Sequence, residues 1–303
     1  MTIPLVTHPS YSFDFPAKHR FPMEKFRLLH RYVQEKGIAH KANTLRPGRG
    51  RIDLLSLAHC PEYLQRFIDN QMDRQEVRRM GLPWSEGLVK RTLISPAGTL
   101  LTAYTALRRG IACHLAGGTH HAHYDFASGF CVLNDLAIAA LSLLKHQQVE
   151  RVLIFDCDVH QGDGTASILQ NEPRVFTCSI HCDKNFPARK ATSDWDVEVP
   201  KGTADQKYLD IVESTLLEAI KRSQPDLIFY DAGVDIYSGD PLGLLNVSLE
   251  GLRQREHLVL EICKNMGIST ATVIGGGYDD DRLALVRRHA MVVEAAADIY
   301  AGF

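Results

Sequence analysis

Apolar positions along this chain alternate between helical spacing and short continuous runs. Met23, Phe26 and Leu29 recur at the spacing of one helix face. The run RVLIF at 151–155 is almost entirely apolar, which is typical of a strand covered on both faces of a parallel sheet. Helices are expected at 22–35, 61–70, 98–109, 137–145, 163–169, 204–222, 249–266 and 282–300, and strands at 111–116, 151–155, 174–180, 226–230 and 270–274. Repeated strand–helix units predict a three-layer α/β/α fold with a mainly parallel central sheet.

No linker divides the chain. It has no Ser/Gly-rich tract, no low-complexity segment and no internal repeat, so we expect a single domain over residues 1–303. Lys and Arg number 34 and Asp and Glu number 36, which gives a formal net charge of −2. This balance argues against direct nucleic-acid binding and against a polybasic membrane anchor, because both need a positive field.

The apolar segments and the cysteines indicate the cellular compartment of the protein. The longest strongly apolar run, 137–144, is far shorter than the ~20 residues that span a bilayer. The first residues lack the basic and apolar regions of a signal peptide. The seven cysteines contain no CxxC pair, which argues against a disulfide framework and against a cysteine-based zinc site. We therefore expect a cytoplasmic protein with reduced thiols and no membrane span.

Polar residues gather after four of the predicted strands. The segments are GGTHHAHYDFASGF at 117–130, DCDVHQGDG at 156–164, DAGVDIYSGDPLG at 231–243 and GGGY at 275–278. The carboxyl ends of parallel strands meet at one edge of a sheet, and ligands of open α/β folds bind there. The four segments therefore predict an active site at this edge.

The segment at 156–164 offers metal ligands. Asp156, Asp158 and His160 alternate, so an extended chain points them to one side. Carboxylates with a neutral imidazole suit Zn²⁺ or another divalent transition metal, although an Asp–His salt bridge or capping of the helix at 163 would also explain them. Asp235 could supply a further carboxylate. Two Asp and one His leave a coordination position open, as in catalytic zinc sites.

Two adjacent histidines and one tyrosine are candidates for proton transfer. His120 and His121 could act in proton transfer or as ligands, and each needs a carboxylate on its second ring nitrogen. Asp156 and Asp163 are the candidates for that carboxylate. Tyr278 follows three glycines, so its hydroxyl could donate to a developing oxyanion, or the ring could simply be packed.

These segments, together with SIH at 179–181, resemble the zinc-dependent histone deacetylase family of the arginase/deacetylase superfamily. The resemblance runs from about Tyr11 to the end. The compact length, HRFPMEKF at 19–26 and the segment at 185–205 are most similar to the class IV deacetylases and their short bacterial-type relatives. The resemblance implies a zinc-dependent hydrolase that uses metal-activated water to remove acetyl or longer fatty acyl groups from lysine in proteins or peptides.

The resemblance also implies a role for each matching residue. The implied zinc ligands are Asp158, His160 and Asp235, with Fe²⁺ as a substitute ion. The implied proton-transfer set is His121 oriented by Asp163, His120 hydrogen-bonded to Asp156, and Tyr278 on the substrate carbonyl. The implied substrate-binding residues are Gly129, Phe130, Phe186 and Gly276. The implied ligands of a structural K⁺ ion are Asp156, Asp158, His160, Ser179 and Ile180.

Three positions depart from the family pattern. Gln161 stands where many relatives have a second histidine, and Asp231 adds a carboxylate before Asp235. Pro22 lies near the place where some members carry an arginine, so the resemblance does not imply an acetate-release pocket gated by that arginine.

Three other functions remain as alternatives. An acetylpolyamine or other small-molecule N-acetyl amidohydrolase would share the chemistry, although the chain has no room for the dimerisation loop usual in that branch. An arginase-like ureohydrolase would need two Mn²⁺ ions and further bridging carboxylates. A non-catalytic acyl-lysine binder would not need the complete set of histidines, ligands and tyrosine.

Overall fold

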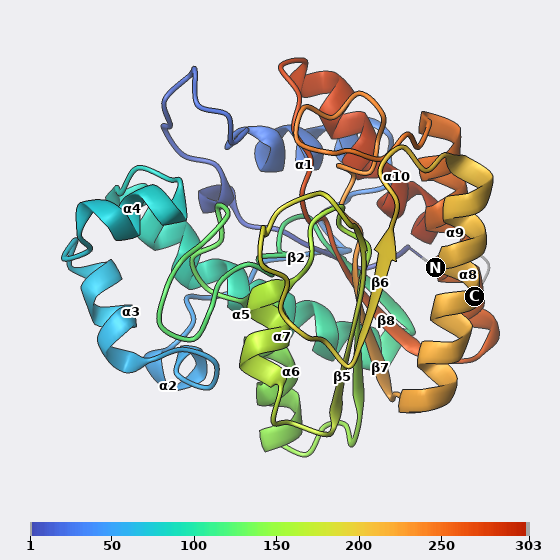
Figure 1. The fold of residues 1–303 in the computed structure, drawn as a ribbon, viewed down its shortest axis with the longest axis horizontal. Coiled ribbons are helices and arrows are strands. Elements are labelled where there is room, and N and C mark those ends of the chain that lie inside the picture. Colours follow the sequence, from blue (N-terminus) through green and yellow to red (C-terminus); the bar gives the residue numbers. More distant parts are fainter. Residues whose placement is uncertain (1, 301–303) are drawn as a thin grey trace.

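The computed structural model describes residues 2–300 and has a parallel sheet at its centre (Figure 1). The eight strands run in the order β2-β1-β3-β8-β7-β4-β5-β6, and each neighbouring pair is parallel. They are β1 (Leu5–Val6), β2 (Thr44–Leu45), β3 (Ile111–His114), β4 (Val152–Asp156), β5 (Val175–Cys182), β6 (Trp195–Val199), β7 (Leu227–Asp231) and β8 (Ser269–Val273). The predicted parallel sheet is confirmed.

Helices cover both faces of this sheet, which confirms the three-layer α/β/α fold (Figure 1). They are η1 (Pro9–Tyr11), α1 (Lys25–Glu35), α2 (Ile52–Leu55), α3 (Pro61–Ile68), α4 (Arg74–Met80), α5 (Glu86–Arg109), α6 (Asp135–Lys145), α7 (Asp163–Leu169), α8 (Asp205–Ser223), α9 (Leu249–Asn265) and α10 (Arg282–Tyr300). The chain moves outward from β3 to β6 with α6 and α7 on one face. It then returns through β7 and β8 with α8 and α9 on the other face, as right-handed crossovers require.

Helix α5 begins well before its expected start at residue 98. Ser85 caps it by accepting from the Leu88 N–H at 3.1 Å, and the helix continues through Pro96. Proline removes one backbone hydrogen bond and disfavours a helix interior, but Leu88 and Leu93 of the early turns are buried. Burial of this apolar face therefore outweighs the local cost of the proline.

Strands β1, β2 and β6 and helices α2 and α4 were not expected. β1 and β2 contain two residues each, which is too short for a period to appear. α4 reads RQEVRRM and buries only Met80, so it has no apolar stripe. These elements depend on contacts with distant parts of the chain.

The register of the central strands sets the position of the site. Asp156 at the end of β4 pairs with Asp231 at the end of β7, and Asp231 pairs with Val273 of β8. The polar segments that follow these strands therefore start side by side at one edge of the sheet. No helix among residues 2–300 is long and apolar enough to cross a membrane.

Candidate active site

Asp158, His160 and Asp235 lie close enough to hold one metal ion. Each offers one ligand atom, and these atoms all lie within 4.8 Å of one another. His160 Nδ1 is 3.0 Å from Asp158 Oδ1 and 3.2 Å from Asp235 Oδ2. Two residues come from the segment after β4 and one from the segment after β7, so the pairing of these strands brings the three together.

This donor set fits a divalent cation such as zinc. Asp235 Oδ2 is buried and forms no hydrogen bond of good geometry within residues 2–300, although His160 lies near it. A Cβ atom on Gly276 would lie 2.1 Å from Asp235 Oδ2 and 2.5 Å from Asp158 Oδ2, so only glycine leaves these oxygens room. Burial and the neighbouring Asp158 carboxylate raise the pKa of Asp235. A bound cation would remove that cost, because it stabilises both charged carboxylates.

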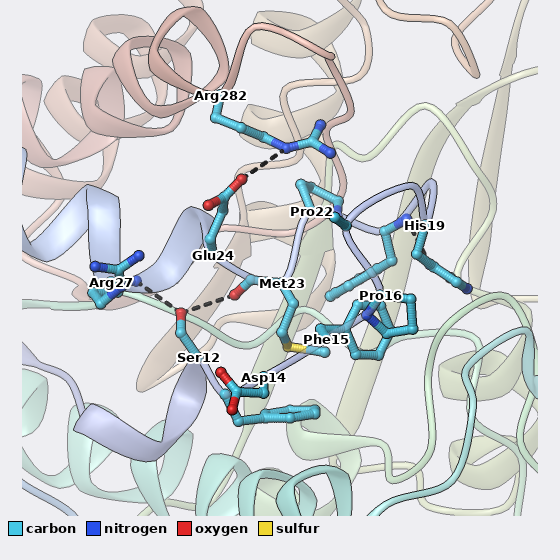
Figure 2. A pocket seen from close by; sticks show the side chains of 13 residues that line it. Ser12, Asp14, Phe15, Pro16, His19, Pro22, Met23, Glu24, Arg27 and Arg282 are labelled. Atoms are coloured by element: carbon cyan, nitrogen blue, oxygen red, sulfur yellow. Dashed lines mark hydrogen bonds and ion pairs between the residues drawn. The ribbon is translucent and has the colours of Figure 1, made fainter.

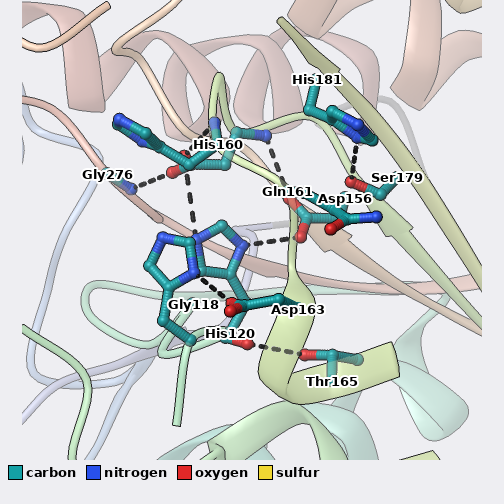
Figure 3. Close-up of polar contacts among 12 residues, drawn as sticks. Gly118, His120, Asp156, His160, Gln161, Asp163, Thr165, Ser179, His181 and Gly276 are labelled. Atoms are coloured by element: carbon teal, nitrogen blue, oxygen red, sulfur yellow. Dashed lines mark hydrogen bonds and ion pairs between the residues drawn. The ribbon is translucent and has the colours of Figure 1, made fainter. Parts of the chain in front are cut away.

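Each of the two adjacent histidines faces its own carboxylate. His121 Nδ1 lies 2.6 Å from Asp163 Oδ1, and His120 Nδ1 lies 2.7 Å from Asp156 Oδ2 (Figure 3). The centres of the two imidazole rings are 4.1 Å apart. These are the carboxylates expected from the sequence, and each binds Nδ1, which leaves Nε2 of each ring for the site.

The two histidines titrate in opposite directions. Burial and the nearby His120 lower the pKa of His121 to about 4, so its imidazole is neutral at pH 7. Burial opposes protonation of His120 as well, but the carboxylates of Asp156 and Asp158 raise its pKa well above the usual value. One ring can therefore accept a proton while its neighbour holds one.

An open cavity of about 460 Å³ leads to these groups from the surface. Its lining includes His121, His160, Phe130, Phe186 and Tyr278. The Phe186 ring lies 4.8 Å from the His121 ring, and the Phe130 ring lies 5.8 Å from the Tyr278 ring. Phe186 therefore lies beside His121 and Phe130 lies beside Tyr278 in the lining of one cavity.

A tight turn at Gly129 and Phe130 places the Phe130 ring in the cavity lining. Gly129 and Phe130 have φ angles of 52° and 66°, in the left-handed region that costs energy for a side chain such as that of Phe130. A Cβ atom at Gly129 would lie 2.6 Å from His121 Cδ2. Glycine is therefore required at 129 for the backbone to approach His121 this closely.

A family model described as the histone deacetylase domain matches residues 19–294. The chain belongs to the histone deacetylase family. An uncharacterized protein of Picosynechococcus sp. is 47% identical to it over 99% of this chain and 100% of its own length. Histone deacetylase clr6 of Schizosaccharomyces pombe is 30% identical, over 91% of this chain and 72% of its own. The solved HDA15 HD domain is 20% identical with a TM-score of 0.79, over 99% of this chain and 91% of that one, which shows a shared fold.

Membership of the histone deacetylase family supports a hydrolytic deacetylase that acts on an acetylated substrate. Of the residues that the family resemblance singled out, Asp156 and Ser179 lie opposite each other in the β4–β5 pair, and Ile180 follows. Ser179 Oγ lies 3.0 Å from His181 Nδ1 (Figure 3). Three of the five residues expected to hold a monovalent cation, Asp156, Ser179 and Ile180, are therefore neighbours in the sheet, and Asp158 and His160 follow in the segment after β4.

Gln161, one of the departures from the family pattern, has a structural contact. Its Nε2 donates to the Ala191 carbonyl at 2.9 Å and to Asp196 Oδ1 at 2.7 Å, and its Oε1 accepts from the Ala191 N–H at 2.8 Å. Gln161 thus anchors the segment between Phe186 and β6. Phe186, which lines the cavity, lies directly before this segment.

Asp231, the second departure, lies inside the site. It is fully buried, and neither carboxylate oxygen has a hydrogen-bond partner among residues 2–300. Asp231, His120 and Asp156 form a second group whose ligand atoms lie within 4.8 Å of one another. Burial and the Asp156 carboxylate raise the pKa of Asp231 well above the usual value. The extra carboxyl group therefore lies close to His120 and Asp156, where burial and the second carboxylate disfavour its charged form.

His123 is a contact that sequence reasoning missed. Its Nε2 lies 3.2 Å from Asp163 Oδ2, the oxygen that His121 does not use. Its ring stacks on Phe126 with centres 4.2 Å apart. The only signal in the sequence is that His123 lies two residues after His121 in the same segment, which places both on one side of an extended chain.

Two buried cations were also missed. Lys25 and Arg91 line a small inner cavity together with His121, His160 and Tyr278. Lys25 Nζ lies 3.1 Å from His289 Nε2 and donates to the Gly275 carbonyl at 3.2 Å. Burial lowers the pKa of Lys25 to about 8 and that of Arg91 to about 10. Neither cation could be found from the local sequence pattern, because Lys25 and Arg91 belong to separate helices, α1 and α5, and only the packing of these helices brings them to one cavity.

A separate surface pocket of about 400 Å³ lies between residues 12–24 and the start of α10 (Figure 2). Ser12 Oγ donates to the Met23 carbonyl at 2.8 Å, and Arg282 pairs with Glu24 at 3.3 Å. Its lining contains none of the histidines, carboxylates or tyrosine of the candidate site. Residues 12–24 nonetheless contact the candidate site, because the centre of the Phe21 ring lies 5.6 Å from that of the Phe130 ring.

Proposed function

We propose that this chain is a zinc-dependent hydrolase that removes an acyl group, acetyl or a longer fatty acyl, from the side-chain amine of lysine in proteins or peptides. One observation carries the proposal. A neutral imidazole, His121, faces the same cavity as a carboxylate–histidine metal site and a buried tyrosine hydroxyl. Amide hydrolysis needs these three groups: a base, an activated water and a donor to the oxyanion.

Asp158, His160 and Asp235 would hold the zinc ion, which when bound activates a water molecule and polarises the amide carbonyl. His121 accepts a proton from that water through Nε2, because Nδ1 is engaged by Asp163. The same nitrogen then donates the proton to the leaving amine, a role that typically contributes about 10²- to 10⁴-fold.

Tyr278 stabilises the oxyanion in this proposal. Burial raises the pKa of its hydroxyl well above the usual value, so the hydroxyl keeps its proton at any assay pH. A neutral hydroxyl in a buried site is an effective donor to a developing negative charge.

Phe130 and Phe186 enclose the apolar stem of the substrate lysine, with Gly129 and Gly276 leaving space at the cavity wall. The released acid lies within reach of the inner cavity, where Lys25 and Arg91 supply positive charge. These cations take the place of the arginine that some family members carry near the position of Pro22. We further propose that Asp156, Asp158, His160, Ser179 and Ile180 hold a structural K⁺ ion.

A panel of lysine peptides from acetyl to myristoyl, assayed with zinc-loaded protein, tests the proposal. Hydrolysis of at least one acyl-lysine peptide, blocked by a hydroxamate chelator, is expected. Failure on every peptide would overturn the proposal. Hydrolysis of acetylpolyamines in preference to all the peptides would instead identify a small-molecule amidohydrolase.

A further inference from the structure

The outer part of the cavity is lined by three arginines and by no carboxylate. Arg20, Arg78 and Arg79 all line it, and all three are exposed. None of them takes part in an ion pair among residues 2–300; the arginines that do so are others. We call these three residues the arginine rim. Their charge is available to a ligand, because no carboxylate among residues 2–300 lies within ion-pair distance of them.

Helix α4 fixes two of these cations beside the cavity wall. Its start is held by a capping box between Asp73 and Glu76. At its end, the Phe130 N–H donates to the Met80 carbonyl at 2.9 Å. A Cβ atom on the following Gly81 would lie 2.9 Å from the Phe130 ring. The last turn of α4, which carries both arginines, therefore packs directly on the wall of the proposed lysine tunnel.

The guanidinium of Arg79 is further oriented by an aromatic ring. It lies 4.0 Å from the centre of the Phe126 ring, which in turn stacks on His123. A cation over a ring face is held in place without losing its charge. His123 contacts Asp163, so this arginine is connected through packed side chains to the carboxylate that orients His121.

Arg20 approaches the same wall from a different part of the chain. Its neighbours His19 and Phe21 place their rings 6.1 Å and 5.6 Å from that of Phe130. Two segments that are distant in sequence thus bring positive charge to one opening. The whole chain has a formal net charge of −2, so the positive field at this opening is local.

We propose that the arginine rim selects acyl-lysine substrates whose flanking residues are acidic. The inference rests on the proposed deacylase function, in which the acyl group points inward toward Asp158 and His160. The residues on either side of the substrate lysine then lie at the opening, among the three guanidinium groups. Carboxylates there form charge-assisted hydrogen bonds with arginine, whereas lysine or arginine in the substrate is repelled.

Three acyl-lysine peptides of equal length, with flanking Glu, Gln or Lys, test the rim on the zinc-loaded protein. We expect kcat/KM for the acidic peptide to exceed that for the neutral peptide by about tenfold at low salt, and the basic peptide to be the poorest substrate. The preference should shrink as ionic strength rises, because the Debye length falls from about 10 Å at 0.1 M to about 3 Å at 1 M.

Variants connect this preference to the rim. In R78Q/R79Q and in R20Q the ratio of kcat/KM for the acidic peptide to kcat/KM for the neutral peptide should fall by about threefold or more. R74Q is the matched control, because Arg74 is exposed on the same helix but does not line the cavity, and it should keep the full preference. Equal kcat/KM for the three peptides in the unmodified protein would overturn the inference while leaving the deacylase proposal intact.

A binding measurement separates the two proposals. Fluorescence anisotropy measures the affinity of labelled peptides for the Tyr278→Phe variant, in which turnover is largely removed. The acidic peptide should bind tightest. If no peptide is hydrolysed but this order of binding holds, the deacylase proposal fails and the charge selection stands. Tighter binding of the basic peptide, or cleavage of small acylated amines bearing a carboxylate in preference to the acidic peptide, would overturn the inference.

Discussion

The Nη1 atom of Arg255 donates a hydrogen bond to the carbonyl oxygen of Gly233 at 2.8 Å. The same atom lies 3.2 Å from the carbonyl oxygen of Cys157. Gly233 precedes Asp235 by two residues, and Cys157 directly precedes Asp158. One fully buried cation on α9 therefore ties together the two backbone segments that carry the proposed metal ligands.

Replacing Arg255 with methionine should destabilise the protein by about 3–5 kcal/mol, because it leaves the buried carboxylate of Glu256 without its cation. Zinc affinity should also weaken, because both ligand-bearing segments lose their common donor. Urea unfolding and chelator competition measure these two effects. The double variant Arg255→Met/Glu256→Leu removes both charges and should be more stable than the single variant. Equal stability of the two variants would contradict this account of the pair.

Tyr278→Phe should keep the metal and lose most of the activity. Removal of one donor to an oxyanion typically costs about 3–4 kcal/mol, or about 10²- to 10³-fold in kcat. The hydroxyl is the only group removed, and the Phe130 contact of the ring remains. Metal analysis and steady-state kinetics on one preparation check both parts. Turnover near that of the unmodified protein would exclude the proposed role.

Asp235→Ala should abolish stoichiometric zinc binding, because it removes one of the three ligand candidates and leaves Asp158 and His160 alone. Asp280→Ala is a suitable control, since Asp280 is exposed and lies in the segment that follows the neighbouring strand β8. Zinc content after dialysis against buffer distinguishes the two. A normal zinc content in the Asp235 variant would remove this residue from the ligand set.

Zinc binding at pH 7 should release at least one proton. In the metal-free protein burial opposes protonation of His160, but its hydrogen bonds to Asp158 and Asp235 raise its pKa to about 10. Zinc needs the neutral imidazole, so apparent affinity should rise by about tenfold per pH unit below that value. Calorimetry in buffers of different ionisation enthalpy counts the protons. A binding enthalpy that does not depend on the buffer would contradict the prediction.

The same shift affects the stability of the metal-free protein. The folded-state pKa of His160 lies above its ordinary value of 6.5. Its contribution to the free energy of unfolding is therefore complete below pH 6.5 and is lost as the pH rises through about 10. Metal-free protein should accordingly unfold at a lower urea concentration at pH 9 than at pH 6, and equal midpoints at the two pH values would contradict this contribution.

Local sequence pattern was sufficient for five strands of the central sheet, β3, β4, β5, β7 and β8. Continuous apolar runs such as 151–155 identify strands that are buried on both faces. Since parallel strands end at one edge of the sheet, the polar residues that follow them had to meet. That Asp156 and Asp163 lie beside His120 and His121 follows from that rule, whereas the specific pairing, Asp163 with His121 and Asp156 with His120, is the one that the family resemblance implies. The location of the site was therefore predictable from the strands themselves, which are short and apolar and are repeatedly followed by Gly, Asp and His.

Contacts between distant segments decided the rest. The inner cations Lys25 and Arg91, the arginine rim and the reach of Arg255 to two loops depend on where separate helices pack. Periodicity records only whether a side chain is buried, and it does not record which distant backbone the side chain meets. The sequence alone determined the chemistry at the strand ends. Only the tertiary structure determined which charges surround that chemistry, because those charges come from elements packed around the sheet and not from the strands themselves.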